Sequence, residues 1–190
     1  MQYQVIRSQR KTLSLEIREG RLLVRAPMRV SDAAVERFVQ IHRVWIEKQL
    51  LIAKKRIEIA DREAPLTASD IHALAERAKR VIPERVAHYA DLIGVKYGRI
   101  TVRNQRSKWG SCSEKGNLNF NCLLMLAPPQ VVDCIVVHEL CHRKEMNHSA
   151  AFYREVLRVF PEYYQWNAWL KQNGATLMRR MQNGMQATEQ

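Results

Sequence analysis

The chain has 190 residues, of which 46% are hydrophobic and 26% are charged, the proportions of an ordinary globular protein. This length allows one domain with a real core, or one domain with a smaller lobe. No apolar run approaches the roughly 20 residues that span a bilayer, and residues 1–7 lack the apolar segment of a signal peptide. We therefore expect a cytoplasmic protein without membrane contact.

The net charge is +12, because 31 Lys and Arg residues face 19 Asp and Glu residues. Such an excess favours anionic partners, namely nucleic acid, nucleotides or acidic protein surfaces. A basic surface can also serve solubility alone, so both interpretations stay open.

The four cysteines include no CxxC pair, which excludes a zinc ribbon and a disulfide framework. In a reducing compartment they are expected to be free and mostly buried thiols. They are Cys112, Cys122, Cys134 and Cys141.

The N-terminal segment alternates apolar and polar residues over residues 3–25, with a turn at Gly20. This pattern predicts a β-hairpin or a small sheet that ends at Pro27. Ser31 and Asp32 are suitable N-cap residues for a following helix. Apolar residues spaced by three and four over residues 35–50 predict that this helix is amphipathic, and its later part is strongly basic.

A second helix is expected to start in the polar stretch 67–70 and to end near Gly94, a natural C-cap. Pro83 lies inside it and predicts a kink or a break. Two strands are expected further along the chain, one around Ile100 and one over residues 118–124, joined by a polar loop.

The last third of the chain is expected to be helical. Pro128 and Pro129 are suited to the first turn of a helix over about residues 130–144. Shorter helices are expected after the cap at residues 147–149 and after Pro161, and the polar tail beyond Gly174 is expected to fray.

Within the predicted helix 130–144, the segment His138-Glu139-Leu140-Cys141-His142 fits the pattern HExxH. Residues four apart lie on the same face of a helix, so both imidazoles can reach one ion. Glu139 lies about 100° round the helix from His138, where its carboxylate can act on a metal-bound water without being a ligand. The pattern predicts a zinc hydrolase in which Glu139 is the catalytic carboxylate.

An HExxH pattern can also arise by chance on an ordinary helix with satisfied core histidines. The apolar run 131–137 before the motif argues against this, because an uncompensated charge in a buried helix is costly. Three of the six histidines also fall between positions 138 and 148, whereas His42, His72 and His88 are expected to be surface residues.

The third metal ligand is predicted to be His148, six residues beyond His142. In one large class of zinc peptidases, a glycine midway between the second and third histidine lets the chain turn back toward the metal. This chain has Glu145 at that position. We therefore expect Asn147, in a left-handed conformation, to make the turn. Glu155 or Glu162 would be the competing ligand. Three neutral imidazoles suit an open catalytic zinc site, which favours His148.

Four blocks of the sequence stand in a distinctive order: Ser-Lys-Trp-Gly-Ser-Cys at 107–112, Asn-Phe-Asn at 119–121, the HELCH helix at 138–142, and Asn-His-Ser-Ala-Ala-Phe at 147–152. In order and spacing, over roughly residues 104–164, these blocks resemble the YgjP-like family of zincin-type metal-dependent hydrolases. The N-terminus and the basic helices are similar more loosely.

The resemblance implies an α+β fold with a zincin-like catalytic core, a β-rich N-terminal portion and long basic helices. It carries over His138, His142 and His148 as metal ligands and Glu139 as the catalytic carboxylate. Related sequences often have arginine at Lys108, and lysine is only a point charge for an anion.

We expect one compact unit composed of a small sheet at 1–30, a helical segment at 31–98, the metal-binding core at 99–175 and a frayed tail at 176–190. Two interpretations of the block around Cys112 stay open. In the first, Trp109 packs over the site, Gly110 permits close backbone approach and Ser111 hydrogen-bonds locally. In the second, Cys112 is a nucleophile or redox thiol, although no further histidine is placed to activate it.

Three functions follow from these residues. The first is a zinc metallopeptidase that aligns an extended peptide or protein substrate on a strand near residues 118–124. The second is a metal-dependent nucleoside triphosphate pyrophosphatase, favoured by the net charge but lacking a P-loop and an acidic Mg²⁺ cluster. The third is a nucleic-acid-associated protease or binding protein, for which the net charge is the only support.

Overall fold

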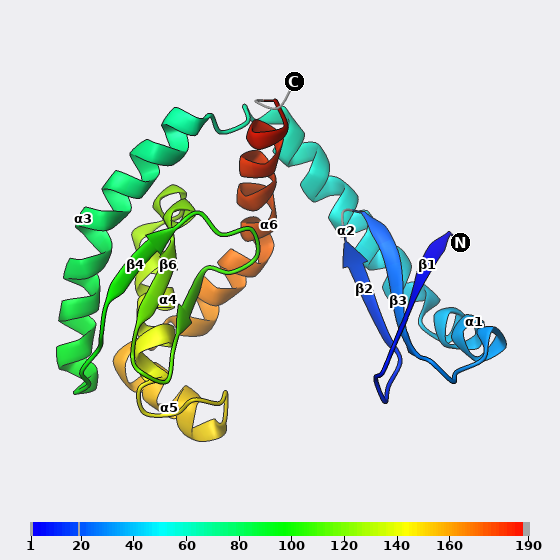
Figure 1. Cartoon of the computed structure of the whole chain (residues 1–190), viewed down its shortest axis with the longest axis horizontal. Helices are drawn as coiled ribbons and strands as arrows, with labels where there is room; N and C mark the ends of the chain where they lie inside the picture. Colours follow the sequence, from blue (N-terminus) through cyan, green and yellow to red (C-terminus); the bar gives the residue numbers. More distant parts are fainter. Residues whose placement is uncertain (1, 19, 188–190) are drawn as a thin grey trace. The chain divides into compact units, whose positions relative to one another are not determined.

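Figure 1 presents a computed structural model of the chain, which describes residues 2–18 and 20–187. The contacts within the chain divide it into two compact units, Met1–Arg62 and Glu63–Gln190. The expected boundary after residue 30 is not where the chain divides, because the helices that follow share a hydrophobic core with the N-terminal sheet. We therefore describe each unit by itself, and the expected assembly of the segments into one compact unit stays a prediction.

The first unit is a three-stranded sheet with two helices. Strand β3 lies in the middle, parallel to β1 and antiparallel to β2, which confirms the small sheet. Ser31 caps the first helix as predicted, and the helical stretch is divided near His42. The elements are β1 (Tyr3–Ser8), β2 (Ser14–Arg18), β3 (Arg21–Pro27), α1 (Asp32–Ile41) and α2 (Arg43–Arg62).

The second unit combines four helices with a second small sheet. Its elements are α3 (Ala68–Ile93), β4 (Ile100–Arg103), β5 (Gly110–Cys112), β6 (Leu118–Asn121), the 3-10 helix η1 (Cys122–Leu126), α4 (Pro129–Cys141), α5 (Ala150–Val159) and α6 (Tyr163–Ala187). The two units together confirm the α+β class that we expected.

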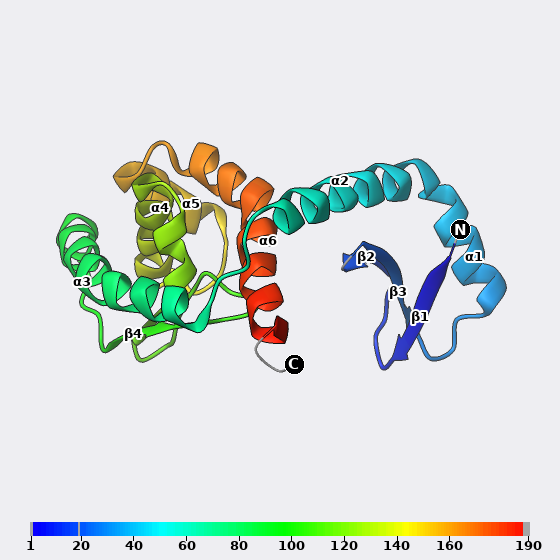
Figure 2. The same cartoon turned by 90° about the horizontal axis from the view of Figure 1, so that it is seen from above.

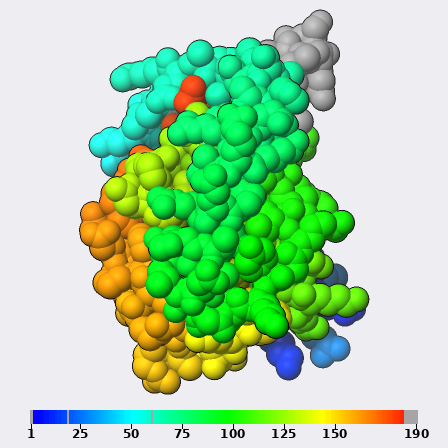
Figure 3. Space-filling model, turned by 90° about the vertical axis from the view of Figure 1, so that its left-hand side faces the viewer, coloured from blue at the N-terminus to red at the C-terminus, as the bar shows by residue number. Residues whose placement is uncertain are grey.

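Helix α3 begins and ends where the sequence predicts. Thr67 and Asp70 form a capping box, and Gly94 ends the helix in the left-handed conformation with φ of 75°. Of the two outcomes predicted at Pro83, the break is wrong, because α3 is one helix across this residue, and the kink stays a prediction. Figure 3 shows α3 lying along one face of the second unit, with α5 in yellow near one of its ends.

The second sheet has the order β4-β6-β5, in which β4 is parallel and β5 antiparallel to β6. Strand β5 lies inside the segment that the sequence assigns to a polar loop. Its three residues are too few to show an alternation of apolar and polar residues. The strand is therefore recognised only from its pairing with β6. The predicted strand 118–124 is shorter than expected, since residues from Cys122 onward form η1.

Helix α4 lies at the centre of the second unit and contacts α3, α5 and α6 (Figure 2). Most of its residues are buried, including Val131, Val136 and Leu140, because the helix is apolar around nearly its whole circumference. The helix that carries HExxH is therefore held on several sides. This rigidity fixes the direction of the side chains at its C-terminal end.

Helix α6 differs most from expectation, since it is 25 residues long and continues through the segment that we expected to fray. Met178 and Met181 are buried against Leu66 and Leu123, and this packing compensates for the polar sequence around them. Residues 188–190 of the expected tail lie outside the described residues. No helix among the described residues has the length and hydropathy required to cross a membrane.

Candidate metal centre

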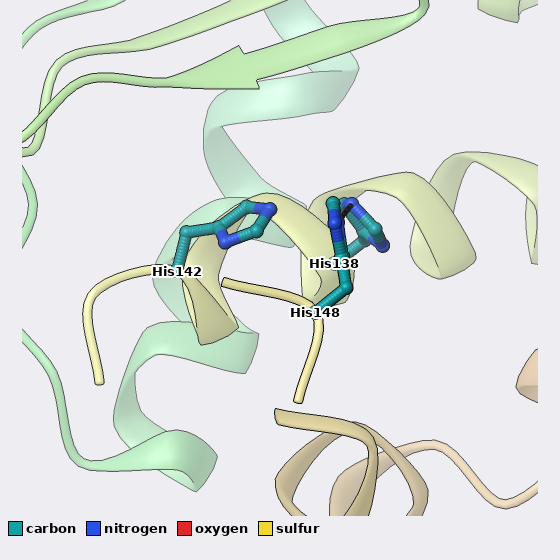
Figure 4. A group of neighbouring side chains, drawn as sticks. All are labelled: His138, His142 and His148. Atoms are coloured by element: carbon teal, nitrogen blue, oxygen red, sulfur yellow. Dashed lines mark hydrogen bonds between the residues drawn. The ribbon is translucent and has the colours of Figure 1, made fainter. Parts of the chain in front are cut away.

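Three histidines converge at the C-terminal end of α4. His138 lies in its last turn, His142 is its C-cap, and His148 lies on the loop before α5. Figure 4 shows the three imidazole rings turned toward one another. One nitrogen of each ring lies within 4.8 Å of the other two, and the Nε2 atoms of His138 and His148 are 3.1 Å apart.

The two competing carboxylates are engaged elsewhere. Glu155 forms ion pairs of 2.6 Å with both Lys144 and Arg158. Glu162 accepts a hydrogen bond from the indole N–H of Trp166. Among the described residues, the group that could hold a metal ion is thus the histidine triad.

The chain turns from His142 to His148 without a glycine. The amide N–H groups of Lys144 and Glu145 donate to the carbonyl of Cys141, which tightens the end of α4. The Asn147 side chain then accepts from the amide of Ser149, whose own hydroxyl caps α5. The left-handed conformation of Asn147 stays a prediction.

Hydrogen bonds at Nδ1 orient two of the three rings. Nδ1 of His142 lies 3.0 Å from the carbonyl oxygen of Glu145, which can only accept, so this nitrogen carries the proton and Nε2 presents its lone pair. Nδ1 of His138 lies 2.9 Å from the hydroxyl of Tyr163, the first residue of α6. In this way α6 helps to position a histidine of α4.

The electrostatics of the triad suit metal binding, because a histidine must be neutral to act as a ligand. Burial lowers the pKa of His138 to about 4, and it also lowers the pKa of His142. Phe152 packs against all three rings with centroid distances of 4.6 to 5.0 Å. Burial thus favours the neutral form of His138 and His142, and an aromatic neighbour holds all three rings in place.

The donor set fits a divalent ion. Two imidazole nitrogens on a tetrahedral zinc ion are about 3.3 Å apart, given zinc–nitrogen bonds of about 2.05 Å. The 3.1 Å between Nε2 of His138 and Nε2 of His148 is close to this value. His142 is buried while His148 is exposed, so the triad is accessible from one side.

Glu139 lies beside the triad and against strand β5. Its side chain is buried, and its carboxylate accepts a hydrogen bond from the backbone N–H of Cys112. Burial raises the pKa of Glu139 to about 7, although the charge of Lys108 and the Cys112 N–H act in the opposite direction. A carboxyl group with this pKa can both accept and release a proton near neutrality.

Gly110 makes this contact with β5 possible. A Cβ atom on Gly110 would lie 2.6 Å from Oε1 and 2.8 Å from Cγ of Glu139, far closer than van der Waals contact. The backbone of β5 and the Glu139 side chain therefore pack together only because residue 110 has no side chain.

The other residues of the Trp-Gly-Ser-Cys block also make packing contacts. The Trp109 ring packs on α6 at Gly174, where an added Cβ would meet the indole at 3.0 Å. Ser111 accepts a hydrogen bond from the side chain of Asn119. Burial raises the pKa of the Cys112 thiol, which opposes a thiolate nucleophile. The packing interpretation agrees with these contacts.

A pocket of about 320 Å³ opens beside His138 and Glu139. Its apolar lining comes from β5, α4 and α6, and two lysines, Lys108 and Lys171, also line it. Its lining residues are Lys108, Trp109, Gly110, Ile135, His138, Glu139, Tyr163, Asn167, Leu170 and Lys171.

Comparison with known families gives a match that covers most of the chain. Residues 11–72 and 61–173 match the YgjP-like family, described as a metallopeptidase domain. The chain belongs to the YgjP-like family. The expected family is thereby confirmed, its description as a metallopeptidase domain supports a metal-dependent hydrolase, and membership in it implies a divalent metal.

Individual relatives are more distant. The chain is 35% identical to the UTP pyrophosphatase of Escherichia coli (strain K12) over 60 residues, which span 32% of this chain and about a third (36%) of that protein. Among solved structures it resembles the metallopeptidase zymogens of Pyrococcus abyssi abylysin and Methanocaldococcus jannaschii jannalysin. The sequence identities are 23% and 21%, and the TM-score is 0.44 for both; the matches cover 48% and 49% of this chain and 93% and 96% of the other chains.

The structure brings together the three histidines that the sequence singled out, and the fourth residue, Glu139, lines the same pocket as His138. Sequence reasoning missed Tyr163, whose hydroxyl contacts His138. Its position after Pro161 indicates only a helix start. No local pattern could reveal that the first residue of α6 reaches a histidine 25 positions earlier.

Proposed function

We propose that this protein is a zinc-dependent metallopeptidase, with His138, His142 and His148 as metal ligands and Glu139 as the general base. The observation that carries the proposal is the convergence of three imidazoles, two of them with pKa values lowered by burial, beside a buried carboxylate that borders an edge strand. Zinc held by these histidines would polarise a substrate carbonyl and lower the pKa of a water molecule.

The side chains of the site have separate roles in the reaction. Glu139 takes a proton from the attacking water while the oxygen of that water bonds to the peptide carbonyl carbon. Glu139 then delivers the proton to the amide nitrogen as the C–N bond breaks. Tyr163 and the carbonyl of Glu145 hold the rings of His138 and His142 in orientation.

Strand β5 is the element that suits an extended substrate. The strand near residues 118–124, which we expected in this role, is β6, and it is paired on both sides by β4 and β5. The amides of Asn121 and Ser113 bond across to Trp109 and Asn117, so the backbone groups of Gly110 and Cys112 face away from β6. The Cys112 N–H already donates to Glu139, so a peptide added along this edge would pair with the remaining outward groups and pass beside Glu139.

Zinc content and one substitution test the proposal. We expect one zinc per chain by elemental analysis, and hydrolysis of a mixed peptide library by the wild type. The Glu139→Gln variant should keep its zinc and lose activity by about 10²- to 10⁴-fold, because the base is gone while the ligands remain. Absence of stoichiometric zinc, or full turnover by Glu139→Gln, would refute the assignment.

The similarity to a UTP pyrophosphatase supports a second candidate, a metal-dependent nucleoside triphosphate pyrophosphatase that uses the same site. Pyrophosphate release from nucleotides, abolished by Glu139→Gln, together with no cleavage in the peptide library, would favour it. A nucleic-acid partner and a cytoplasmic location remain predictions from composition, and steeply salt-dependent DNA binding would support the former.

A further inference from the structure

The pocket beside the triad carries an unbalanced positive charge. Lys108 enters it from the segment before β5 and Lys171 from α6, and the one acidic residue that lines it is Glu139, whose carboxylate packs against Gly110 of β5. Within the described residues, neither lysine forms an ion pair. Two unpaired cations in a concave site attract an anionic group.

The neighbourhood of Lys171 strengthens this imbalance. The residues three and four positions away on α6 are Asn167, Ala168, Gly174 and Ala175, none of which is acidic. Arg106 lies two residues before Lys108 and is also exposed. No neighbouring carboxylate on these segments is therefore placed to neutralise the pocket lysines.

Part of the pocket lining is apolar. Ile135 and Leu170 are buried, and the Trp109 ring is packed against α6. A ligand suited to this lining has a short hydrocarbon stem that ends in a negative charge. A glutamate side chain has both, with two methylene groups and a carboxylate.

We propose that this pocket is a specificity subsite for an acidic side chain, so that the enzyme cleaves peptides beside a glutamate. This inference rests on the proposed peptidase function and adds the class of substrate. Lys171 binds the carboxylate as a charged hydrogen-bond donor, and Lys108 adds to the positive potential.

A nucleoside triphosphate fits the pocket less well. Its volume of about 320 Å³ is at the low end for ligand pockets, which span about 300–1,000 Å³. A triphosphate is commonly held by bidentate arginines or by successive backbone N–H groups. No arginine belongs to the described lining of this pocket.

The test is a charge exchange at Lys171. We choose Lys171 because Lys108 lies close enough to Glu139 to lower the pKa of that carboxyl, and its replacement would disturb the base. Three peptides that differ only beside the scissile bond, with Glu, Gln or Lys there, are compared for kcat/KM. We expect the wild type to prefer Glu over Gln by about tenfold, and Lys171→Glu to prefer Lys over Glu.

The matched control is Lys115→Glu, which changes the net charge equally at an exposed lysine outside the pocket. It should keep the wild-type preference for Glu. If Lys115→Glu inverted the preference as well, the effect would arise from overall charge and the subsite would be refuted.

Binding separates this proposal from the proposed function. In zinc-loaded Glu139→Gln protein, calorimetry should give about tenfold tighter binding of the Glu peptide than of the Gln peptide, and the difference should vanish when Lys171→Glu is added. Equal binding of the two peptides refutes the subsite even if peptides are cleaved. UTP binding that depends on Lys171, with no discrimination among peptides, would also refute it and assign the lysines to phosphate.

Discussion

Replacing Gly110 by alanine tests the contact between β5 and the carboxylate of Glu139. The new Cβ would lie 2.6 Å from Oε1, 2.8 Å from Cγ and 3.0 Å from Cδ of Glu139, whereas ordinary contact begins near 3.4 Å. The side chain must therefore retreat by about 0.8 Å, the difference between 2.6 and 3.4 Å. Three of its atoms are affected and the side chain is 6% exposed, so rotation of the carboxylate alone does not relieve the contact.

The expected loss is larger in activity than in stability. A catalytic group displaced by about 1 Å costs about 10²-fold in rate, and overpacking a buried site costs about 1–3 kcal/mol. The three histidines are not among the atoms that the new Cβ meets, so zinc binding should persist. We expect kcat/KM for peptide cleavage to fall about 10²-fold with one zinc per chain retained.

The assay combines kinetics, elemental analysis and urea unfolding of the zinc-loaded protein. Gly98→Ala is the control, because its Cβ would also meet an oxygen at 2.6 Å, but at the end of the Asn117 side chain and with no second atom closer than 3.5 Å. It should retain activity. Wild-type activity and stability in Gly110→Ala would show that β5 does not confine Glu139.

Three further predictions concern the surroundings of the site. Tyr163→Phe removes the partner of Nδ1 of His138 and should weaken zinc binding about 10- to 100-fold in a chelator competition, and unchanged affinity would exclude the orienting role. The two cationic partners of Glu155 lower its pKa to about 2. The Glu155 carboxylate should therefore stabilise the fold above about pH 4.3, and this contribution should be lost as the pH falls toward 2. Because the partners are partly exposed, Glu155→Gln should lower the free energy of unfolding in urea by about 1–2 kcal/mol at pH 7 and by little at pH 2. An equal decrease at both pH values would contradict the ion pairs. Met181→Ala should lower the free energy of unfolding by about 2–4 kcal/mol if α6 packs as described. If this part of α6 were frayed, the substitution would leave the free energy of unfolding unchanged.

The sequence alone determined the features that depend on neighbours along the chain. The i,i+4 spacing places His138 and His142 on one helix face, and short-range capping chemistry marks the starts of helices at Ser31, Thr67 and Ser149. His148 is near enough in sequence to be placed beside them. These features need only local geometry, which residue type and spacing encode directly.

The tertiary structure decided what depends on segments far apart in the chain. Strand β5 exists because β6 pairs with it, and Gly110 matters because Glu139, 29 positions later, packs against it. Helix α6 continues because Met181 packs against Leu66 and Leu123, which no local propensity reveals. The sequence by itself thus determined the spacing of the three candidate metal ligands. Tertiary packing decided how the Glu139 carboxylate is confined and which cations line the pocket beside His138, because both depend on contacts between distant segments.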